Sequence, residues 1–481
     1  MPIRRITADD LQARRWELLA LTSVGAFMTP FDGAIVSVAL PVMSPELNLS
    51  FAASMWVQAA YLLTVAVLLI PFGRLADQRG RVRYYLMGTV VFVIGSLLAG
   101  FSTGGALLIA SRVVQGAGGA LLAATSAAIV TAVFPPSERG RALGINVMAV
   151  YMGLSVGPPL GGFITDAFGW RWIFFVNVPI GVAVLVWGWL LLPHGERESS
   201  APRVDVAGAA LLASFLVCLL VPLTFAPTWG WASALAVTLL AIAAASLVAF
   251  VFVERRVTAP LLDLDLLLHN RLFAAANLAA LLNYMALYAI GVLTAVFLEV
   301  VQGRSAAQSG WLLLSQPLLM AVLSPLSGRL SDRIGSRWLA TGGMVAVAAG
   351  MVLLATLDAA TGMGRIAFSL SVVGVGMAAF SAPNSSAIMG SVRRDQLGLA
   401  SGFLGTMRTA GQALSVALLG GIAAGPLGVA GGRLLFSHGH DGSALTAAAA
   451  SGFASGYQTA MLVGAGLALV GAAVSLTRGG G

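Results

Sequence analysis

Two ionisable residues lie inside apolar stretches where a charge is costly. Asp32 lies in the apolar run at residues 17–40, and Arg112 lies in the run at 104–132. A charged side chain at the centre of a membrane helix costs roughly 2.5–3.5 kcal/mol on insertion scales, so we expect both residues to have a role. Burial disfavours an ionised carboxylate, whereas a nearby cation favours it. A carboxyl that water reaches from one side at a time would therefore load and unload a proton, and a fixed Asp32–Arg112 ion pair is the alternative.

The elements that position these residues are membrane spans. The chain has 481 residues, of which 58% are hydrophobic and only 10% are charged, compared with roughly 25% charged residues in a soluble domain. A membrane helix needs about 20 apolar residues. Fourteen suitable runs lie near residues 17–40, 54–73, 84–101, 104–132, 141–165, 170–192, 206–225, 231–253, 271–300, 305–327, 338–357, 362–390, 398–425 and 456–476. We therefore expect an all-α polytopic membrane protein.

Arginine sets the expected orientation, because the chain contains no lysine among its 27 basic residues. Only Arg171, Arg304, Arg365 and Arg433 fall in segments on the side opposite the N-terminus, whereas 21 arginines fall on the N-terminal side. An excess of basic residues marks the cytoplasmic side. We therefore expect both termini in the cytoplasm and the chain in a bacterial cytoplasmic membrane. The arginines form no basic domain, so nucleic acid is not an expected partner.

The chain repeats itself at corresponding places. GRLADQRGRVR at residues 73–83 recurs as GRLSDRIGSRW at 328–338, and GRALG at 140–144 resembles GLASG at 398–402. The first pair follows the second span of a six-span block, and the second pair opens the fifth span. Parallel repeats of this kind form a cavity at their interface and alternate its access by rocking.

These repeats divide the chain into three parts. We expect a six-helix bundle at residues 1–193, a linker with two additional transmembrane helices at 194–270, and a second six-helix bundle at 271–481.

The stretch NVMAVYMGLSVGPPLGG carries glycines four residues apart, at Gly153, Gly157 and Gly161. On a helix these glycines form one smooth stripe against which a neighbouring helix can pack closely. Pro158 and Pro159 are expected to interrupt the helix, since neighbouring helices in lipid can restore the freed backbone bonds.

The loop at residues 73–83 contains a possible charge latch. Asp77 can accept bonds from helix N-terminal amides or pair with Arg81, in a contact that one conformation holds and another breaks. Gly73 is expected to let the second span pass close to a neighbour. The alternative is that the arginines only fix the topology.

Four motifs in order resemble those of the major facilitator superfamily, and within it the fourteen-span drug:proton antiporters. Gly153, Gly157, Pro158, Gly161 and Gly162 match the antiporter motif of the fifth span. Gly73, Asp77, Gly80 and Arg81 match the signature loop, with Asp332 and Arg333 in its second copy. Arg112, Gln115, Gly116 and Gly118 match the motif of span four, and WRWIFFVNVPIG at 170–181 matches that of span six.

The resemblance implies that Asp32 carries the proton and that Arg112 relays it. It implies a monomer that needs no cofactor, is driven by the proton gradient and has protons, the lipid bilayer and an amphipathic small molecule as partners. The chain departs from the family pattern at Ala34 and Ser37, where threonine and asparagine are usual. Leu370 stands where the second half would repeat Arg112, so the proton chemistry is expected in the first half.

Polar residues on several spans are candidates for contact with a substrate in the cavity. They are Gln58, Tyr61, Gln115, Tyr151, Asn277, Asn283, Tyr284, Tyr288, Gln316 and Asn384. Each could instead be a polar side chain that is bonded between helices. Arg408 is expected to be a buried charge with a structural or gating role. Glu299, near the outer end of its span, is either a rim residue that attracts cations or a snorkelling carboxylate.

The sequence therefore predicts a proton-coupled exporter of amphipathic organic compounds, of the multidrug efflux type. The same scaffold could instead export or flip a lipid or a cell-made metabolite. A receptor is less well supported, and an enzyme would need a nucleophile with a base or a ligand cluster at membrane depth, neither of which is present. His438, His440 and Asp441 are a weak metal candidate, and we expect no metal site. The segment at 257–269 is expected to lie along the inner interface.

Overall fold

The structure, a computed structural model, describes residues 14–135, 138–191, 205–257, 260–262, 264–393, 396–436 and 444–478. All regular elements among these residues are helices. Fourteen helices in the described ranges are long and apolar enough to cross a membrane. The prediction of an all-α fold with fourteen spans is confirmed.

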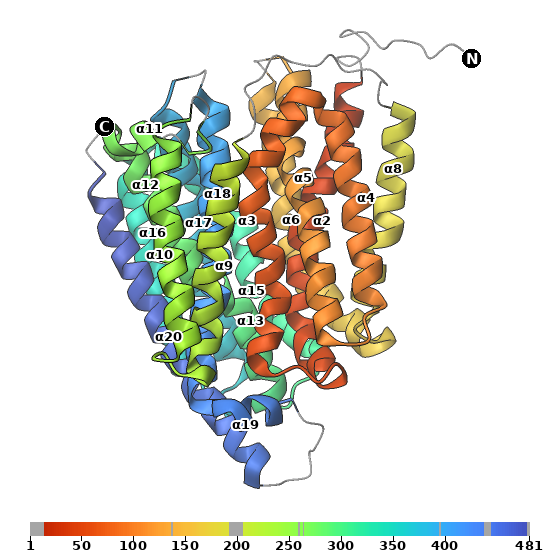
Figure 1. Ribbon diagram of the computed structural model, residues 1–481, viewed down its shortest axis with the longest axis vertical. Coiled ribbons are helices and arrows are strands. Elements are labelled where there is room, and N and C mark those ends of the chain that lie inside the picture. Colours follow the sequence, from red (N-terminus) through yellow and green to blue (C-terminus); the bar gives the residue numbers. More distant parts are fainter. Residues whose placement is uncertain are drawn as a thin grey trace.

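Six spans form the first half of the molecule. They are α2 (Arg15–Glu46), α3 (Phe51–Arg79), α4 (Arg81–Gly100), α5 (Gly105–Val133), α6 (Arg139–Phe168), and the broken pair α7 (Trp172–Phe175) and α8 (Asn177–Leu191). Figure 1 shows these helices, in red to yellow, side by side on one side of the molecule.

The second half contains six further spans, several of them broken. They are α12 (Arg271–Leu287) with α13 (Ala289–Val296) and η1 (Phe297–Val301), α14 (Ala306–Leu313) with α15 (Ser315–Ile334), α16 (Ser336–Ala355), α17 (Met363–Gly390), α18 (Leu397–Ala424) with η3 (Gly425–Leu427), and α20 (Ala444–Leu476). The short helices α11 (Leu264–His269) and α19 (Gly428–Leu434) lie before and within this half.

Two additional spans, α9 (Val206–Trp229) and α10 (Ala234–Glu254), lie in front of the seam between the halves in Figure 1. Phe225 of α9 stacks on Trp56 of α3, with ring centroids 6.2 Å apart. On the other side of the seam, a Cβ on Gly421 would collide with the backbone carbonyl of Leu223. Helix α9 therefore packs on both halves, and α10 packs on α9.

The same turn occurs in both halves. Gly80 between α3 and α4 has φ +108°, and Gly335 between α15 and α16 has φ +87°. Side chains rarely adopt such a backbone conformation, so glycine is required at both turns. This finding supports the internal repeat read from the two signature loops.

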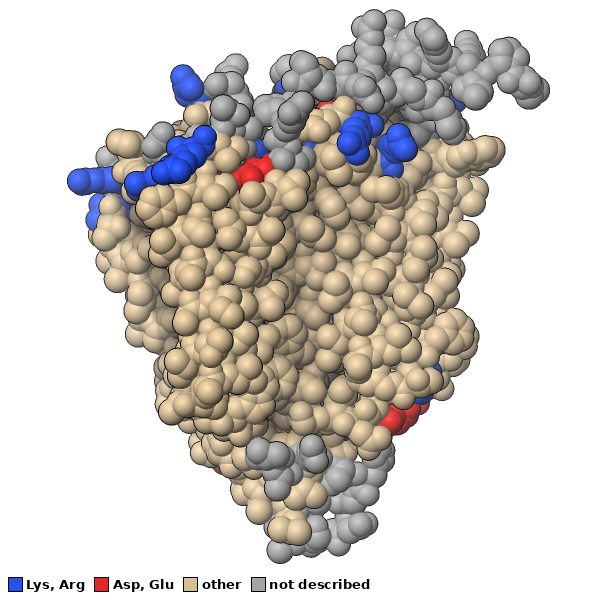
Figure 2. Space-filling model, viewed as in Figure 1, with Lys and Arg blue, Asp and Glu red and all other residues tan. Residues whose placement is uncertain are grey.

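The charged side chains visible in Figure 2 lie at the two ends of the molecule, and a wide belt without visible charged side chains separates them. The blue residues gather at the upper end, which we call the arginine-rich end; the other we call the far end. The start of α2 and the end of α20 both lie at the arginine-rich end in Figure 1. This distribution agrees with a membrane-spanning chain whose basic loops share one side.

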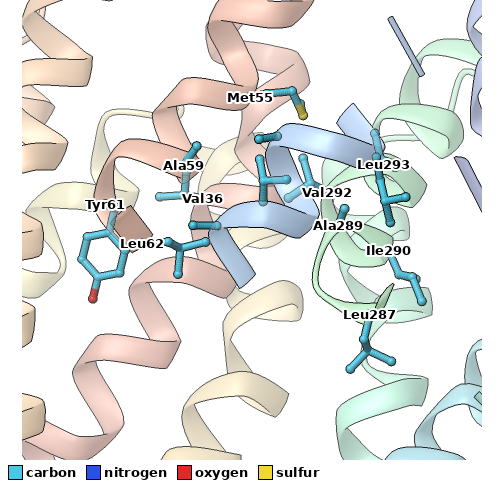
Figure 3. Packing of buried hydrophobic residues seen from close by; sticks show 14 of the residues in the cluster. Val36, Met55, Ala59, Tyr61, Leu62, Leu287, Ala289, Ile290, Val292 and Leu293 are labelled. Atoms are coloured by element: carbon cyan, nitrogen blue, oxygen red, sulfur yellow. The ribbon is translucent and has the colours of Figure 1, made fainter. Parts of the chain in front are cut away.

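The buried apolar core continues from one half into the other. Val36, Met55 and Leu62 of the first half belong to the same cluster as Ile290 and Leu293 of the second. Figure 3 shows Val36, Met55 and Leu62 on first-half helices close to the second-half helix that carries Ile290 and Leu293. The halves are therefore joined through close packing in the conformation described.

The glycine stripe of α6 packs against α2, as predicted. A Cβ on Gly153 would lie 2.5 Å from the carbonyl oxygen of Phe27, and one on Gly157 would lie 2.6 Å from the Cβ of Ala34. Gly161 faces Ile35 in the same way, with a Cβ–Cγ1 distance of 2.7 Å. Real side chains do not approach so closely, so the two helices touch backbone to backbone only because these positions lack side chains.

The prediction that the two prolines interrupt this helix is wrong. Helix α6 continues through Pro158 and Pro159 to Phe168. A proline removes one backbone donor and crowds the preceding turn. The surrounding helices hold the segment in a helical course, and the backbone of Pro158 packs against Gly310 of α14.

The far end of the interface between the halves is closed. A Cβ on Gly162 of α6 would collide with the backbone of Ala306 in α14. Nearby, the backbone amide of Ala307 donates to the Asp166 carboxylate at 3.0 Å. The antiporter-type motif thus packs on α2 within its own half and on α14 across the interface.

Candidate functional site

Asp32 of α2 lies at the centre of a fully buried polar cluster. Arg112 of α5 donates to its Oδ2 at 2.5 Å. Gln115 of α5 donates to Oδ1 at 2.7 Å, and Asn177 of α8 donates to the same atom at 2.9 Å. The side chains of Asp32 and Arg112 are 0% exposed. Three donors, one of them cationic, therefore hold the buried carboxylate.

Arg112 has partners besides Asp32. Its Nε donates to the carbonyl oxygen of Val57 at 3.0 Å, and an Nη atom also donates to the side-chain oxygen of Gln115. The guanidinium carbon lies 4.4 Å from the ring centroid of Tyr61, a cation–π contact. The charge of Arg112 is thus distributed over α2, α3 and α5.

Sequence reasoning missed two members of this cluster. Asn177 is a polar residue within the sixth-span motif, and this isolated polarity in an apolar run was the available signal. Ser96 of α4 accepts a bond from Gln115 at 2.8 Å and so holds that amide in place. No sequence pattern distinguishes Ser96 from the other serines of the spans.

The second half covers this site. The hydroxyl of Tyr288, at the junction of α12 and α13, would lie 3.0 Å from a Cβ placed on Gly33. The expectation that water reaches the Asp32 carboxyl from one side is not met in this conformation, because Asp32 is 0% exposed. Separation of α2 from Tyr288 and α13 is the movement that would uncover it.

The loop between α3 and α4 contains the predicted ion pair. The Nε atom of Arg81 lies 2.6 Å from Oδ1 of Asp77. Arg81 also donates to the carbonyl oxygen of Ala128, near the end of α5, at 3.0 Å. The loop is thereby tied to a third helix. Whether this latch breaks in another conformation stays a prediction.

Two other expectations about the signature loops turn out differently. A Cβ on Gly73 would lie 3.7 Å from Ala124, an ordinary contact, so the expected close helix approach at Gly73 is wrong. In the second copy, Arg333 is exposed, while the side chain of Asp332 lies outside the described residues.

The ten candidate cavity residues separate into two groups. Six are at most 2% exposed: Gln58, Tyr61, Gln115, Asn277, Asn283 and Asn384. Most bond within their own half, as Gln58 does to the carbonyl of Gly33 at 2.8 Å and Asn283 does to the sulfur of Met377 at 3.2 Å. Tyr151, Tyr284, Tyr288 and Gln316 are partly exposed. Only this second group is accessible to a substrate in this conformation.

Asn384 accepts its bond from Arg478, the last arginine of the chain. Burial lowers the pKa of Arg478 to about 10. Asn384 thus serves the packing of α17 against the end of α20.

Arg408 is exposed, which corrects the expectation of a buried charge. Its guanidinium lies near Tyr284, whose phenol also lies near Ser381 and Tyr151. The hydroxyls of Tyr151 and Ser381 are 3.3 Å apart and join α6 of the first half to α17 of the second. Sequence gives the depth of Arg408 along its span, but the direction in which it points depends on the packing of α18.

Glu299 lies in the π-helical turn η1 at the far end. Its Oε1 atom is buried without a hydrogen-bond partner, and Ser309 and Asp166 lie nearby. Glu299 is partly exposed, so the choice between a rim residue that attracts cations and a snorkelling carboxylate stays a prediction. The carboxyl lies near the contact between α6 and α14.

No group of three potential metal ligands occurs among the residues that the structure describes. His438, His440 and Asp441 lie outside those residues. In the described part of the segment 257–269, a short helix, α11, precedes α12.

Comparison with known proteins agrees with this architecture. The profile of the Major Facilitator Superfamily matches residues 22–274 and 276–479. The chain belongs to the Major Facilitator Superfamily. It is therefore a membrane transporter and not an enzyme.

Curated relatives of this transporter include drug exporters. It is 34% identical to multidrug resistance protein Stp of Mycobacterium tuberculosis over 85% of this chain and 76% of that protein. It is 32% identical to the tetracenomycin C resistance and export protein of Streptomyces glaucescens, over 88% of this chain and 78% of that protein. It is 31% identical to the riboflavin transporter RibZ of Clostridioides difficile, over 84% of this chain and 87% of that protein.

Solved structures share the fold of this transporter at low sequence identity. A bacterial homologue of the human lysosomal transporter Spinster, in an inward-facing, unoccupied conformation, matches with a TM-score of 0.68 at 16% identity, over 96% of both chains. A D-xylose–proton symporter matches with a TM-score of 0.67 at 14% identity, over 96% of this chain and 97% of that one.

Proposed function

We propose that this transporter exports amphipathic organic compounds across the bacterial cytoplasmic membrane in exchange for protons. The observation that carries the proposal is the buried cluster around Asp32. A carboxylate within a span is costly, and here it is held by a cation and two amides at the face that the second half covers. We further propose that the arginine-rich end is cytoplasmic, and that a monomer works without a cofactor.

The contacts of Arg112 support reversible protonation. When Asp32 takes up a proton, Arg112 loses its counter-ion but retains the Val57 carbonyl, the Gln115 amide oxygen and the Tyr61 ring. Arg112 therefore keeps these three contacts when the acid is protonated, while its Nη2 atom is buried without a hydrogen-bond partner. Rocking that separates α2 from Tyr288 would then give the carboxyl access to the far side.

The energetics of such an exchange are adequate. One proton moving through 100 mV supplies about 2.3 kcal/mol, whereas each tenfold concentration gradient of substrate costs about 1.4 kcal/mol. One or two protons per cycle therefore support a useful gradient of an uncharged compound.

The test is the Asp32→Asn variant in proteoliposomes with an imposed pH gradient and a panel of fluorescent compounds. The amide has nearly the same size and retains hydrogen bonding, so the variant should fold. We expect it to exchange substrate but to lose any response to the pH gradient. Ser37→Ala, five residues further along α2, is the control and should remain coupled. Normal pH-driven efflux by Asp32→Asn would exclude Asp32 as the proton carrier.

Export of an endogenous metabolite is a second candidate, favoured by the similarity to the riboflavin transporter. The two candidates differ in selectivity. A drug exporter should transport several unrelated compounds of the panel, whereas a metabolite exporter should transport one compound that accumulates in cells lacking the protein.

A further inference from the structure

The interface between the halves contains a second polar cluster, which the proton site does not use. We call it the interface cluster, and it consists of Tyr151, Tyr284, Ser381 and Arg408. The Tyr151 and Ser381 hydroxyls lie 3.3 Å apart across the two halves. The phenol of Tyr284 lies near Ser381, Tyr151 and the charge of Arg408. Helices α6, α12, α17 and α18 thus each contribute one residue.

The packing of α18 shows that Arg408 points into this interface. Three residues before it, Gly405 faces α3, where a Cβ would lie 2.9 Å from Leu69. Three residues after it, Gly411 faces α12, where a Cβ would lie 2.7 Å from the carbonyl oxygen of Leu281. Residues three apart share a helix face, so Arg408 lies between the first-half helix α3 and the second-half helix α12.

Arg408 is also accessible, although it lies well inside a span. The side chain is exposed, and the span extends from Leu399 to Leu427. The far end of the interface is closed by Gly162 against Ala306. Arg408 lies nearer the arginine-rich end of this span, and we take that end as its route to solvent.

The positive charge of Arg408 is not balanced nearby. No ion pair of Arg408 with a carboxylate occurs among the described residues, while Arg112 and Asp32 neutralise each other. Glu299 lies at the far end, near Asp166 and Ser309. An exposed guanidinium without a carboxylate partner favours an anion, because its planar fork of N–H donors matches a carboxylate.

On the basis of the proposed function, we propose that the interface cluster binds the carboxylate of an aromatic organic anion as the exported substrate. Arg408 holds the carboxylate through paired N–H donors, and the Tyr284 hydroxyl is a further donor. The rings of Tyr151 and Tyr284 contact the aromatic framework, with Leu404 one turn away on the same face of α18.

This site is distinct from the proton site but adjacent to it. Tyr284 and Tyr288 lie one helical turn apart along α12 and its continuation, and Tyr288 touches α2 beside Asp32. The anion and the proton therefore do not compete for one carboxylate. Inward proton movement and outward anion movement both carry positive charge inward, so an inside-negative potential favours both.

Binding to the purified full-length protein tests the proposal with three probes of one framework: 1-pyrenebutyrate, its neutral amide, and a pyrenylbutyl trimethylammonium ion. Fluorescence anisotropy gives each Kd. We expect the carboxylate to bind about tenfold more tightly than the amide or the ammonium ion. The Arg408→Gln variant should bind the carboxylate probe about tenfold more weakly than the wild type does, and its affinity for the amide probe should change little. Equal binding of carboxylate and amide, or tightest binding of the ammonium ion, would overturn the proposal.

Two further variants keep the result interpretable. Arg408→Lys retains the charge and should restore part of the carboxylate preference even if Arg408→Gln is unstable. Arg329→Gln removes an exposed arginine of α15 and should change no Kd. If Arg329→Gln weakens binding of the carboxylate probe as much as Arg408→Gln does, the effect comes from the overall charge of the protein and the proposal is wrong.

Transport measurements separate this proposal from the proposed function. Pyrenebutyrate efflux should respond more steeply to an imposed membrane potential than amide efflux. Proton-driven efflux without a carboxylate preference would contradict the anion site alone. A carboxylate preference without a response to a pH gradient would contradict proton exchange and leave the anion site standing.

Discussion

Arg112 stabilises the carboxylate of Asp32 while keeping other partners for its own charge. A buried ion pair with no alternative partners would be fixed, because protonation of the acid would leave the cation buried and unpaired at a cost of several kcal/mol. Here the Val57 carbonyl and the Tyr61 ring remain available to Arg112. This arrangement is why we favour a proton carrier over a purely structural pair.

Asn177 should contribute to proton-coupled transport. Asn177→Ala removes a donor to the Asp32 carboxylate, and a hydrogen bond to a charged group contributes about 1.5–3 kcal/mol. A loss of about 1.4 kcal/mol corresponds to a factor of about ten, so the rate of proton-driven transport should fall about tenfold or more. Transport rates measured across a series of pH values check this prediction.

The matched control for this prediction is Ser96→Ala. Ser96 accepts a bond from Gln115 and does not contact Asp32, so its removal should leave the transport rate nearly unchanged. Equal losses in both variants would mean that the rate reports packing of the cluster and not the carboxylate.

For single residues, the sequence shows how deep a charged residue lies along its span, but it does not show which way the side chain points. Asp32 and Arg112 are recognisable because charges are rare inside apolar runs, and the sequence predicts either a proton carrier or a fixed ion pair for them. The position of Arg408 was equally visible, but its exposure depends on Gly405 and Gly411 turning one face of α18 toward the interface. Asn177 was missed because an isolated amide in a span is most often satisfied within its own bundle.

Helix α6 connects the packing of one half to the contact between halves. Gly153, Gly157 and Gly161 face α2, while Gly162, the next residue along, faces α14. A side chain on either face would separate backbones that now touch. Helix α2, which carries Asp32, and helix α14, which contacts α6 at the far end, therefore both pack on α6.

The Gly162→Val substitution should open the far end. The added methyl groups have no space beside the Ala306 backbone, and overpacking of this kind costs about 1–3 kcal/mol. Spin labels on cysteines replacing Phe168 and Trp311, both exposed, should report longer distances between α6 and α14 than in the parent. The parent for labelling carries Cys218→Ser, which removes the single native cysteine.

Gly144→Val serves as the control for this measurement, because nothing lies within 4 Å of a Cβ at Gly144. It should leave the label distances unchanged. Unchanged distances in Gly162→Val as well would contradict a role for this glycine in closing the far end.

At the element scale, the spans and the glycine stripe could be predicted because apolar length and residue spacing are local properties. The effect of Pro158 and Pro159 could not, since the course of α6 at these residues depends on the helices that surround it. The break of α7 from α8 and the π-helical turn at Glu299 are likewise tertiary effects.

For the whole molecule, the essential feature is that each half completes the other's site. Tyr288 from the second half covers Asp32 in the first, and Tyr151 from the first half meets Ser381 in the second. Movement of one half relative to the other therefore changes both polar clusters together. Repeated motifs in the sequence predict two halves, but they do not show which residues meet across the interface.

The central claim is that export and inward proton movement are one coupled process through Asp32. The most direct measurement uses proteoliposomes loaded with a transported compound and a lumenal pH dye, with no imposed pH gradient. As the compound leaves down its own gradient through wild-type protein, protons should enter and the lumen should acidify, whereas Asp32→Asn should release compound without acidification. Release by the wild type at constant lumenal pH, or equal acidification by Asp32→Asn, would contradict the account.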